Sequence, residues 1–172
     1  MYHDRTASKG FTLLEIVVVI AIIGIVMSLA VISLNPDKED ELKTEADRLV
    51  ALASLAAQES VMLSREYALE LSHDGYDFLV FEEQQWSPVE DKIFRPRNLP
   101  QGIYMDVFFE GEEYDFFSDG NKNEEEEHKP RIFMLSSGEM TPFEIIIHSE
   151  DIAHSYHING DLSGKLTLDV ED

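Results

Sequence analysis

The feature that most constrains this chain is an apolar stretch from Phe11 to Leu34, which contains one charged residue, Glu15, and no proline. At a rise of ~1.5 Å per residue, a helix of this length spans about 36 Å, enough to cross a hydrocarbon core of about 30 Å. An α-helix also satisfies its own backbone hydrogen bonds in lipid, where water is absent. The stretch therefore predicts a membrane-spanning helix.

A short basic leader, residues 1–10, precedes this helix and carries Arg5 and Lys9 against one acid, Asp4. A secretory signal peptide also begins with bases, but its apolar core is about 7–15 residues long and ends at a small-residue cleavage site. The apolar stretch here is longer and is not closed by such a site. Because positive residues stay on the cytoplasmic side, we expect a single-pass anchor with a cytoplasmic N-terminus.

Glu15 needs its own explanation, because a carboxylate in a spanning helix costs about 2.5–3.5 kcal/mol at the bilayer centre and less near an end. In one interpretation, the side chain reaches the interface from its place near the cytoplasmic end. In the other, the charge stays buried until it meets a positive partner. If the chain is cut before Phe11, a new α-amine lies four residues from Glu15, and the amine of one subunit can neutralise Glu15 of its neighbour.

The sequence Lys-Gly-Phe-Thr-Leu-Leu-Glu at 9–15, followed by a long apolar helix, resembles the processing signal of type IV pilins and type II secretion pseudopilins. The resemblance implies that a prepilin peptidase cleaves after Gly10 and that the amine of Phe11 is then methylated. It also implies that Glu15 docks the subunit into a filament. Major pilins usually carry a proline where this chain has Ile32, so the kink of their helix is not expected here.

Residues 35–65 predict an amphipathic helix that continues the apolar helix of residues 11–34, with at most a bend at Pro36. Apolar or small residues recur at spacings of three and four, the pattern of one buried helix face. A free coiled coil is the alternative, but the heptads are too few to favour it. The residues of this face are Leu42, Ala46, Leu49, Ala53, Ala56, Ser60 and Leu63.

The rest of the chain, residues 66–172, predicts a globular domain of about seven antiparallel strands, because alternating segments follow one another with short turns between them. Trp86 and Pro88 are assigned to an irregular connection, and a turn is expected at Asn159–Asp161. The predicted fold class is α+β, with a long N-terminal α-helix packed on antiparallel β-sheets. The expected strands cover residues 67–71, 76–81, 102–110, 131–135, 140–148, 156–158 and 165–170.

Charge and composition limit the functions that this chain can have. It has 35 acids against 13 bases, a formal net charge of −22, and no cysteine. Such a chain repels phosphates, which argues against nucleic-acid binding. The absence of cysteine excludes disulfides and thiolate metal sites. The acidic segment 110–130, with a run of four glutamates at 124–127, is expected to be a mobile loop.

Two clusters could hold a metal, but a plainer interpretation is preferred for each. His148, His154 and His157 lie within ten residues, yet a spacing of three on a strand points the last two rings to opposite faces. They are interpreted as ordinary surface histidines rather than as a zinc site.

The second cluster is Asp119, Asn121 and Asn123, which resembles the start of a calcium-binding loop. The EF-hand pattern then fails, because Glu124 stands where glycine is needed and Pro130 where a bidentate glutamate is needed. Loose calcium binding remains the alternative to a solvated loop, and no cofactor is predicted.

Nucleophilic catalysis is not predicted. Ser136 and Ser137 precede Gly138, but no Gly-x-Ser-x-Gly elbow is present and no histidine is paired with either serine. We therefore predict that the chain is not an enzyme.

The segment Phe133–Phe143 resembles the C-terminal motif of the H-type minor pseudopilins of type II secretion, and the segments 49–65 and 67–81 are similar to that family too. The resemblance implies a long helix packed against two antiparallel sheets. It implies a minor subunit near the tip of a short periplasmic pseudopilus, a fibre that helps to export folded proteins across the outer membrane.

The partners implied by the resemblance are the other minor pseudopilins, the major pseudopilin, the prepilin peptidase and the secretion platform of the inner membrane. The implied location is the inner membrane with a periplasmic C-terminal domain, from which the subunit is extracted into the fibre. Two alternatives remain open. One is a minor type IV pilin that uses the acidic loop as a binding surface, and the other is an anchored enzyme that works without residues 1–34.

Overall fold

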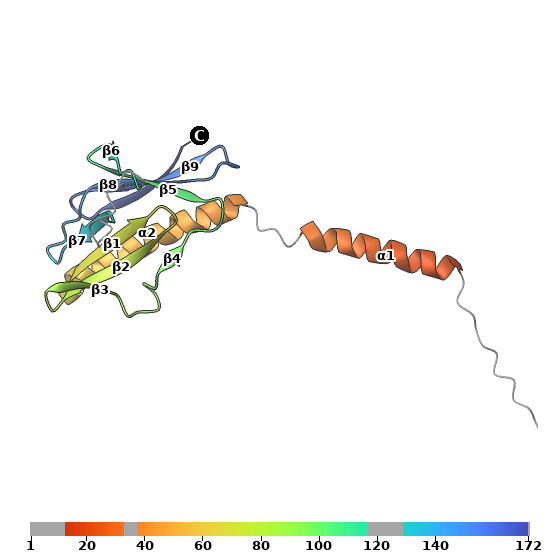
Figure 1. Ribbon diagram of the computed structural model, residues 1–172, viewed down its shortest axis with the longest axis horizontal. Helices are drawn as coiled ribbons and strands as arrows, with labels where there is room; N and C mark the ends of the chain where they lie inside the picture. Colours follow the sequence, from red (N-terminus) through yellow and green to blue (C-terminus); the bar gives the residue numbers. More distant parts are fainter. Residues whose placement is uncertain (1–12, 33–37, 117–128, 172) are drawn as a thin grey trace, which may run out of the picture. The chain divides into compact units, whose positions relative to one another are not determined.

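The computed structural model describes residues 13–32, 38–116 and 129–171, and side chains of the first range only as far as Ile25. The chain divides into two compact units, residues 1–37 and 38–172, and each is described by itself. In the first unit, α1 covers Leu13–Ile32 (Figure 1). In the described part of the chain, neither helix has both the length and the apolar character needed to cross a membrane. The predicted span, residues 11–34, extends past the described residues at both of its ends.

The second unit begins with α2, Lys38–Leu63. Its first turn carries Glu39, Asp40 and Glu41, and acids there interact favourably with the positive end of the helix dipole. The helix ends where Ser64 adopts a left-handed φ of 51° and the Arg65 N–H donates to the Ser60 carbonyl at 3.0 Å. The predicted continuity with the first helix depends on residues 33–37, which lie outside the described residues.

The apolar face predicted for α2 is buried from Leu42 to Ser60, but Leu63 is 52% exposed. The prediction was wrong at Leu63, the last residue of the helix. Ser60 is 1% exposed, and its hydroxyl donates to the carbonyls of Ala57 and Leu135. This serine therefore ties the helix to the segment that follows β7, rather than leaving a polar group unsatisfied in the core.

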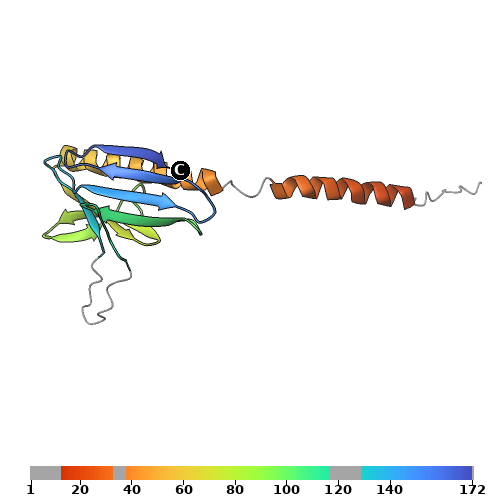
Figure 2. The same ribbon diagram turned by 90° about the horizontal axis from the view of Figure 1, so that it is seen from above.

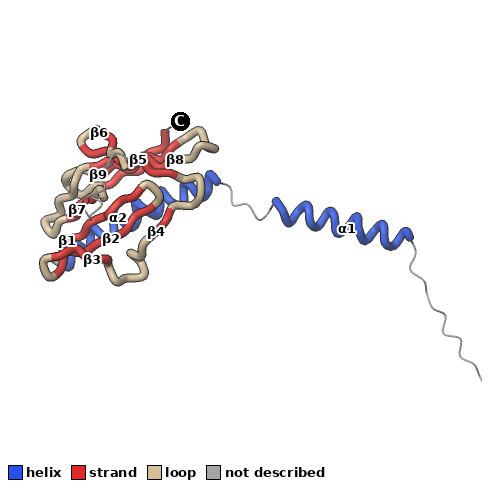
Figure 3. Tube along the Cα trace, viewed as in Figure 1, coloured by secondary structure: helices blue, strands red, loops and turns tan. Residues whose placement is uncertain are grey.

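The described residues form ten strands rather than the predicted seven, all paired antiparallel in two sheets (Figure 3). The first sheet has the order β3-β2-β1-β7, with β4 also paired to β2. Its strands are β1 Glu66–Ser72, β2 Gly75–Glu82, β3 Gln85–Pro88, β4 Arg97–Asn98 and β7 Arg131–Met134. The second sheet has the order β10-β9-β8-β5-β6. Its strands are β5 Tyr104–Phe109, β6 Glu112–Glu113, β8 Phe143–His148, β9 Ser155–Gly160 and β10 Leu166–Glu171.

Helix α2 packs on both sheets, and Figures 1 and 2 show it running along them. It contacts β1 and β7 of the first sheet and β8, β9 and β10 of the second. The predicted class, a helix packed on antiparallel sheets, is confirmed. One buried cluster joins the three layers, and its fully buried members include Leu42, Leu49, Leu69, Leu71, Met105, Ile132, Ile145 and Ile147.

Two connections differ from the sequence prediction. Trp86 and Pro88 belong to β3, which pairs with β2, rather than to an irregular connection. The turn between these strands places Glu83 and Gln84 at φ values of 51° and 65°. Two successive left-handed residues are the signature of a tight type I′ hairpin, which usually shows itself in sequence through Asn or Gly.

The second difference is the last hairpin. Asn159 and Gly160 are strand residues of β9, and the turn lies at Asp161–Gly164 instead. One carboxylate oxygen of Asp161 accepts hydrogen bonds from the backbone N–H groups of Ser163 and Lys165, at 2.9 and 3.1 Å. In the acidic segment 110–130, Glu112 and Glu113 form β6 against β5, and residues 117–128 lie outside the described residues.

Candidate functional site

The first candidate is the start of α1, where Glu15 lies in the first turn. The apolar side chains around it are exposed in the structure, with Leu13 82% and Leu14 74% exposed. A carboxylate in a first turn is favoured by the helix dipole by about 0.3–1 kcal/mol. Gly10 and Phe11, the predicted cleavage and methylation positions, lie outside the described residues. The docking role of Glu15 therefore stays a prediction.

Each of the three histidines considered as a zinc cluster has a different partner in the structure. His148 Nε2 lies 3.0 Å from Asp106 Oδ2, and His157 Nδ1 lies 2.9 Å from Glu144 Oε1. His154 packs its ring edge-on against Tyr156, with centroids 5.6 Å apart. Across the described ranges, no three side chains of His, Asp or Glu are grouped to hold a metal ion.

The other sequence candidates are placed differently. Asp119, Asn121 and Asn123 lie outside the described residues, so calcium binding stays a prediction. The hydroxyl of Ser136 donates to Glu66 at 2.9 Å, and that of Ser137 donates to Glu139 at 3.2 Å. Both serines thus have carboxylate partners, which do not make the histidine-based arrangement of a nucleophile.

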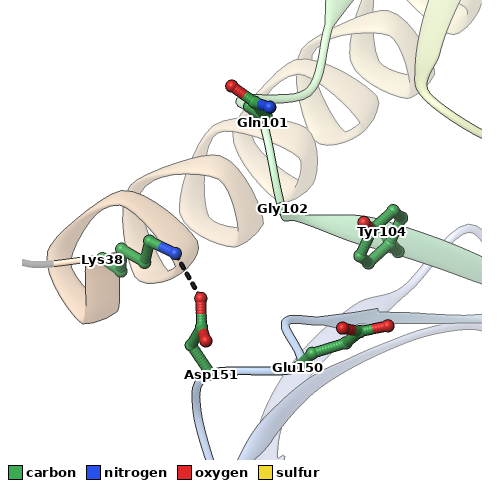
Figure 4. A pocket seen from close by; sticks show the side chains of 6 residues that line it. All are labelled: Lys38, Gln101, Gly102, Tyr104, Glu150 and Asp151. Atoms are coloured by element: carbon green, nitrogen blue, oxygen red, sulfur yellow. Dashed lines mark hydrogen bonds and ion pairs between the residues drawn. The ribbon is translucent and has the colours of Figure 1, made fainter.

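A pocket of about 340 Å³ opens at the start of α2 (Figure 4). Lys38 in the first turn and Asp151 in the β8–β9 connection point toward each other and form an ion pair. The hydrogen bond with Asp151 raises the pKa of Lys38. The ion pair attaches the β8–β9 connection to α2, and the charges of Lys38 and Asp151 neutralise each other. The remaining lining residues are Gln101, Gly102, Tyr104 and Glu150.

The outer face of the first sheet, which faces away from α2, carries an aromatic strip formed by Phe81, Trp86 and Phe133. The Trp86 ring lies 5.2 Å from the Phe81 ring and 5.4 Å from the Phe133 ring. All three side chains are partly exposed and none belongs to the main core cluster. The sequence interpretation missed this strip, because Phe133 lies far along the chain from Phe81 and Trp86 and joins them only after β7 has paired with β1. One signal could have revealed part of it. A two-residue turn at Glu83 and Gln84 places Phe81 opposite Trp86 in a hairpin.

Two residues of β2, Tyr76 and Asp77, have shifted pKa values. Burial, together with the negative charge of Glu45, raises the pKa of Tyr76 to about 12. Burial also raises the pKa of Asp77 above its ordinary value of 3.8, while Lys129 lowers it and Glu70 raises it. Tyr76 is therefore neutral at any physiological pH.

Comparisons with known proteins bear on the whole chain. The prokaryotic N-terminal methylation motif matches residues 5–31. Type II secretion system protein H of Pseudomonas aeruginosa is 37% identical over 146 residues, covering 81% of this chain and 82% of that protein.

Two solved structures share the fold. The crystal structure of the minor pseudopilin EpsH from the type II secretion system of Vibrio cholerae matches with a TM-score of 0.63 at 23% identity, over 77% of this chain and 97% of that one. The type IV minor pilin FimU of Pseudomonas aeruginosa matches with a TM-score of 0.52 at 13% identity, over 77% of this chain and 90% of that one.

The two structural matches establish a common architecture, and the sequence match is more specific. An identity of 37% over most of both chains is to a protein H, and the motif at the N-terminus agrees with it. The predicted resemblance to the H-type minor pseudopilins is thereby confirmed. The chain belongs to the family of type II secretion system protein H, the H-type minor pseudopilins.

Proposed function

We propose that this chain is a structural subunit placed near the tip of a short periplasmic pseudopilus, which helps to export folded proteins across the outer membrane. The observation that carries the proposal is the 37% identity to a protein H over 81% of this chain. The methylation motif at residues 5–31 supports it, since a processed and methylated N-terminus is expected of a fibre subunit. In this role the chain needs no catalytic residue or cofactor.

Assembly begins with processing in this proposal. The inner membrane holds the precursor by residues 11–34, with the leader in the cytoplasm and residues 38–172 in the periplasm. Cleavage after Gly10 frees the amine of Phe11, which meets Glu15 of a neighbouring subunit. Neutralising a carboxylate that would otherwise stay charged in lipid is worth several kcal/mol, of order ~3 at the bilayer centre.

The partners in this proposal are the major pseudopilin, the other minor pseudopilins, the prepilin peptidase and the inner-membrane secretion platform. The minor type IV pilin is the second candidate, because FimU shares the fold. That match has 13% identity, and so it supports the architecture alone. The protein H relative therefore favours type II secretion.

Mass spectrometry of the mature N-terminus tests the proposal. The protein recovered from cells is expected to begin at a methylated Phe11, and Gly10→Glu is expected to leave an uncleaved precursor. Glu15→Ala should be processed normally but recovered in fibres at less than about a tenth of the wild-type level, because a loss of more than ~1.4 kcal/mol per contact lowers incorporation about tenfold.

Glu39→Ala is the matched control, since it removes an acid from the first turn of α2 instead of α1. Recovery of a chain that still begins with Met1 would refute processing. Normal cross-linking of Glu15→Ala to neighbours would refute the docking role. Deleting residues 124–127 tests the alternative of a minor type IV pilin that uses the acidic loop as a binding surface. If that alternative holds, the deletion abolishes ligand binding while fibre assembly is kept.

A further inference from the structure

The aromatic strip of Phe81, Trp86 and Phe133 lies on the face of the first sheet that is turned away from α2. In β2, Phe78 and Val80 point into the core cluster, and Phe81 therefore points outward. Phe81 is the cross-strand partner of Trp86, and Phe133 is the partner of Ala68. Ala68 is 0% exposed although it lies outside the core cluster, so side chains on the outer face of the sheet cover it. The strip thus crosses the sheet from β3 to β7.

A carboxylate with an unused oxygen lies beside the strip. Glu66 is the cross-strand partner of Phe81. Its Oε1 accepts a hydrogen bond from Ser136 at 2.9 Å, whereas its Oε2 is buried and has no hydrogen-bond partner among the described residues. Buried polar atoms are nearly always paired, and an unpaired one calls for an explanation.

Three bases in or next to β1 and β7 already have other partners. Arg65, the preceding residue, lies 3.1 Å from Glu82. Arg131 lies 2.7 Å from Glu70, and Lys129 lies 3.7 Å from the same glutamate. Arg97, in β4 of the same sheet, donates to the Ile93 carbonyl at 3.4 Å. Among the described residues, none of these cations forms an ion pair with Glu66.

We propose that this face, formed by Glu66 and the aromatic strip, receives a lysine or arginine side chain from a neighbouring pseudopilin. A cation over an indole or phenyl ring is attracted to its electron-rich face, and the Glu66 carboxylate supplies the opposite charge. Tryptophan and arginine are also among the residues most enriched where binding energy is concentrated. The inference rests on the proposed function, because it names the chemistry of a contact between fibre subunits.

Charge decides between the possible occupants. The chain has a net charge of −22, and a second copy would bring the same glutamate to the same face. An anionic lipid surface would be repelled for the same reason. A basic side chain of a different subunit supplies the cation that this carboxylate lacks. The aromatic rings of the strip can cover the alkyl part of that side chain. Since Oε2 is buried, the side chains that cover it must shift when the cation enters.

Trp86 makes this shift measurable, because it is the only tryptophan in the chain. The full-length protein in detergent is titrated with the blocked peptide acetyl-Gly-Arg-Gly-amide while tryptophan emission is recorded. The matched probe is the same peptide with citrulline, which keeps the shape of arginine without its charge. We expect a saturable change in emission with the arginine peptide and at least fivefold weaker binding of the citrulline peptide.

Two variants complete the titration. Glu66→Gln keeps the shape and the contact with Ser136 but removes the charge, and it should weaken binding of the arginine peptide at least fivefold. Asp169→Asn removes the same charge from an exposed position of β10 in the second sheet, and it should leave binding unchanged. Equal affinity of the wild type and Glu66→Gln, or no saturable response in the wild type, would overturn the proposal.

A labelling experiment in membranes separates this inference from the proposed function. The chain has no cysteine, so Pro88→Cys introduces a single thiol on the face of Trp86, and Thr167→Cys introduces one on the second sheet. Both positions are exposed in the single chain. In membranes that contain the other pseudopilins, Pro88→Cys should be labelled by a maleimide at least fivefold more slowly than Thr167→Cys.

Co-purification with the other pseudopilins is measured in the same samples. If the wild type does not co-purify, the proposed function fails. If it co-purifies and the two cysteines are labelled equally fast, the proposed function stands and this docking face is refuted.

Discussion

The ring of Phe143 fills the space that a side chain at Gly160 would need. The two residues are cross-strand partners in β8 and β9. An ideal Cβ atom at Gly160 would lie 2.2 Å from Phe143 Cε1, well inside any permitted contact. Phe143 is 6% exposed, so its ring has little room to move away.

Gly160→Ala should therefore destabilise the globular unit by about 1–3 kcal/mol, the usual effect of overpacking a core. Urea unfolding of the full-length protein, followed by circular dichroism, measures the change. Asn159→Ala is the control, since its side chain lies on the other face of the same strand and should change the midpoint little. Identical midpoints for Gly160→Ala and the wild type would show that the ring can leave this position.

The hydroxyl of Tyr76 leads to a second prediction. It is buried without a hydrogen-bond partner among the described residues. Removing a polar atom that has no partner relieves a desolvation penalty, so Tyr76→Phe should leave the free energy of unfolding unchanged or raise it by up to about 1 kcal/mol.

Tyr67→Phe is the matched comparison, because the Tyr67 hydroxyl donates to Glu59 at 3.1 Å. That substitution should lower the free energy of unfolding by about 0.5–1.5 kcal/mol, the net value of one hydrogen bond. The two variants are compared by urea unfolding at neutral pH. A larger loss for Tyr76→Phe than for Tyr67→Phe would reveal a partner of the Tyr76 hydroxyl, such as a bound water.

Asp77 gives a prediction about pH. Burial raises the pKa of its carboxyl above the ordinary value of 3.8, so just above pH 3.8 the folded chain binds more protons at this site than the unfolded chain. Stability from this site is therefore greatest at low pH and is lost as the pH rises through the folded-state pKa.

Asp77→Asn should raise the Tm at pH 7 and flatten the fall of Tm with pH above 3.8. Thermal unfolding at a series of pH values from acid to neutral checks both effects. Asp169→Asn, which removes the same charge at an exposed position, controls for the general relief of a net charge of −22. An equal rise of Tm in both variants would assign the effect to net charge rather than to burial at Asp77.

Local patterns predicted those elements whose signals lie close together in the sequence. The spacing of Leu42, Ala46 and Leu49 predicted the buried face of α2, and the alternation in residues 67–71 and 76–81 predicted the strands of the β1–β2 hairpin. The Asn159-Gly160 pair misled the prediction, because Asn-Gly is typical of a hairpin turn. Here the glycine serves a close approach to Phe143 in a neighbouring strand, which the local sequence does not reveal.

Contacts between distant segments were beyond local patterns. The pairing of β1 with β7 joins residues 67–70 to 131–134, and it brings Phe133 to Trp86. The processing signal predicted at Gly10, Phe11 and Glu15 was visible in the sequence, because its residues lie close together in the chain. The roles of these three residues stay predictions. The face beside Glu66 was not visible, because it exists only after the four strands β3, β2, β1 and β7 have paired.

The surface of α1 has a consequence for how neighbouring subunits find their places. From Leu13 to Ile25 its side chains are apolar all round apart from Glu15, and they are exposed in the structure. A helix that is equally apolar on every face has no preferred rotation about its long axis. It can rotate and slide against similar helices at little cost in free energy. A single acid near one end, Glu15, breaks that symmetry. If Glu15 docks as proposed, it sets both the rotation and the axial position of each new helix in the fibre.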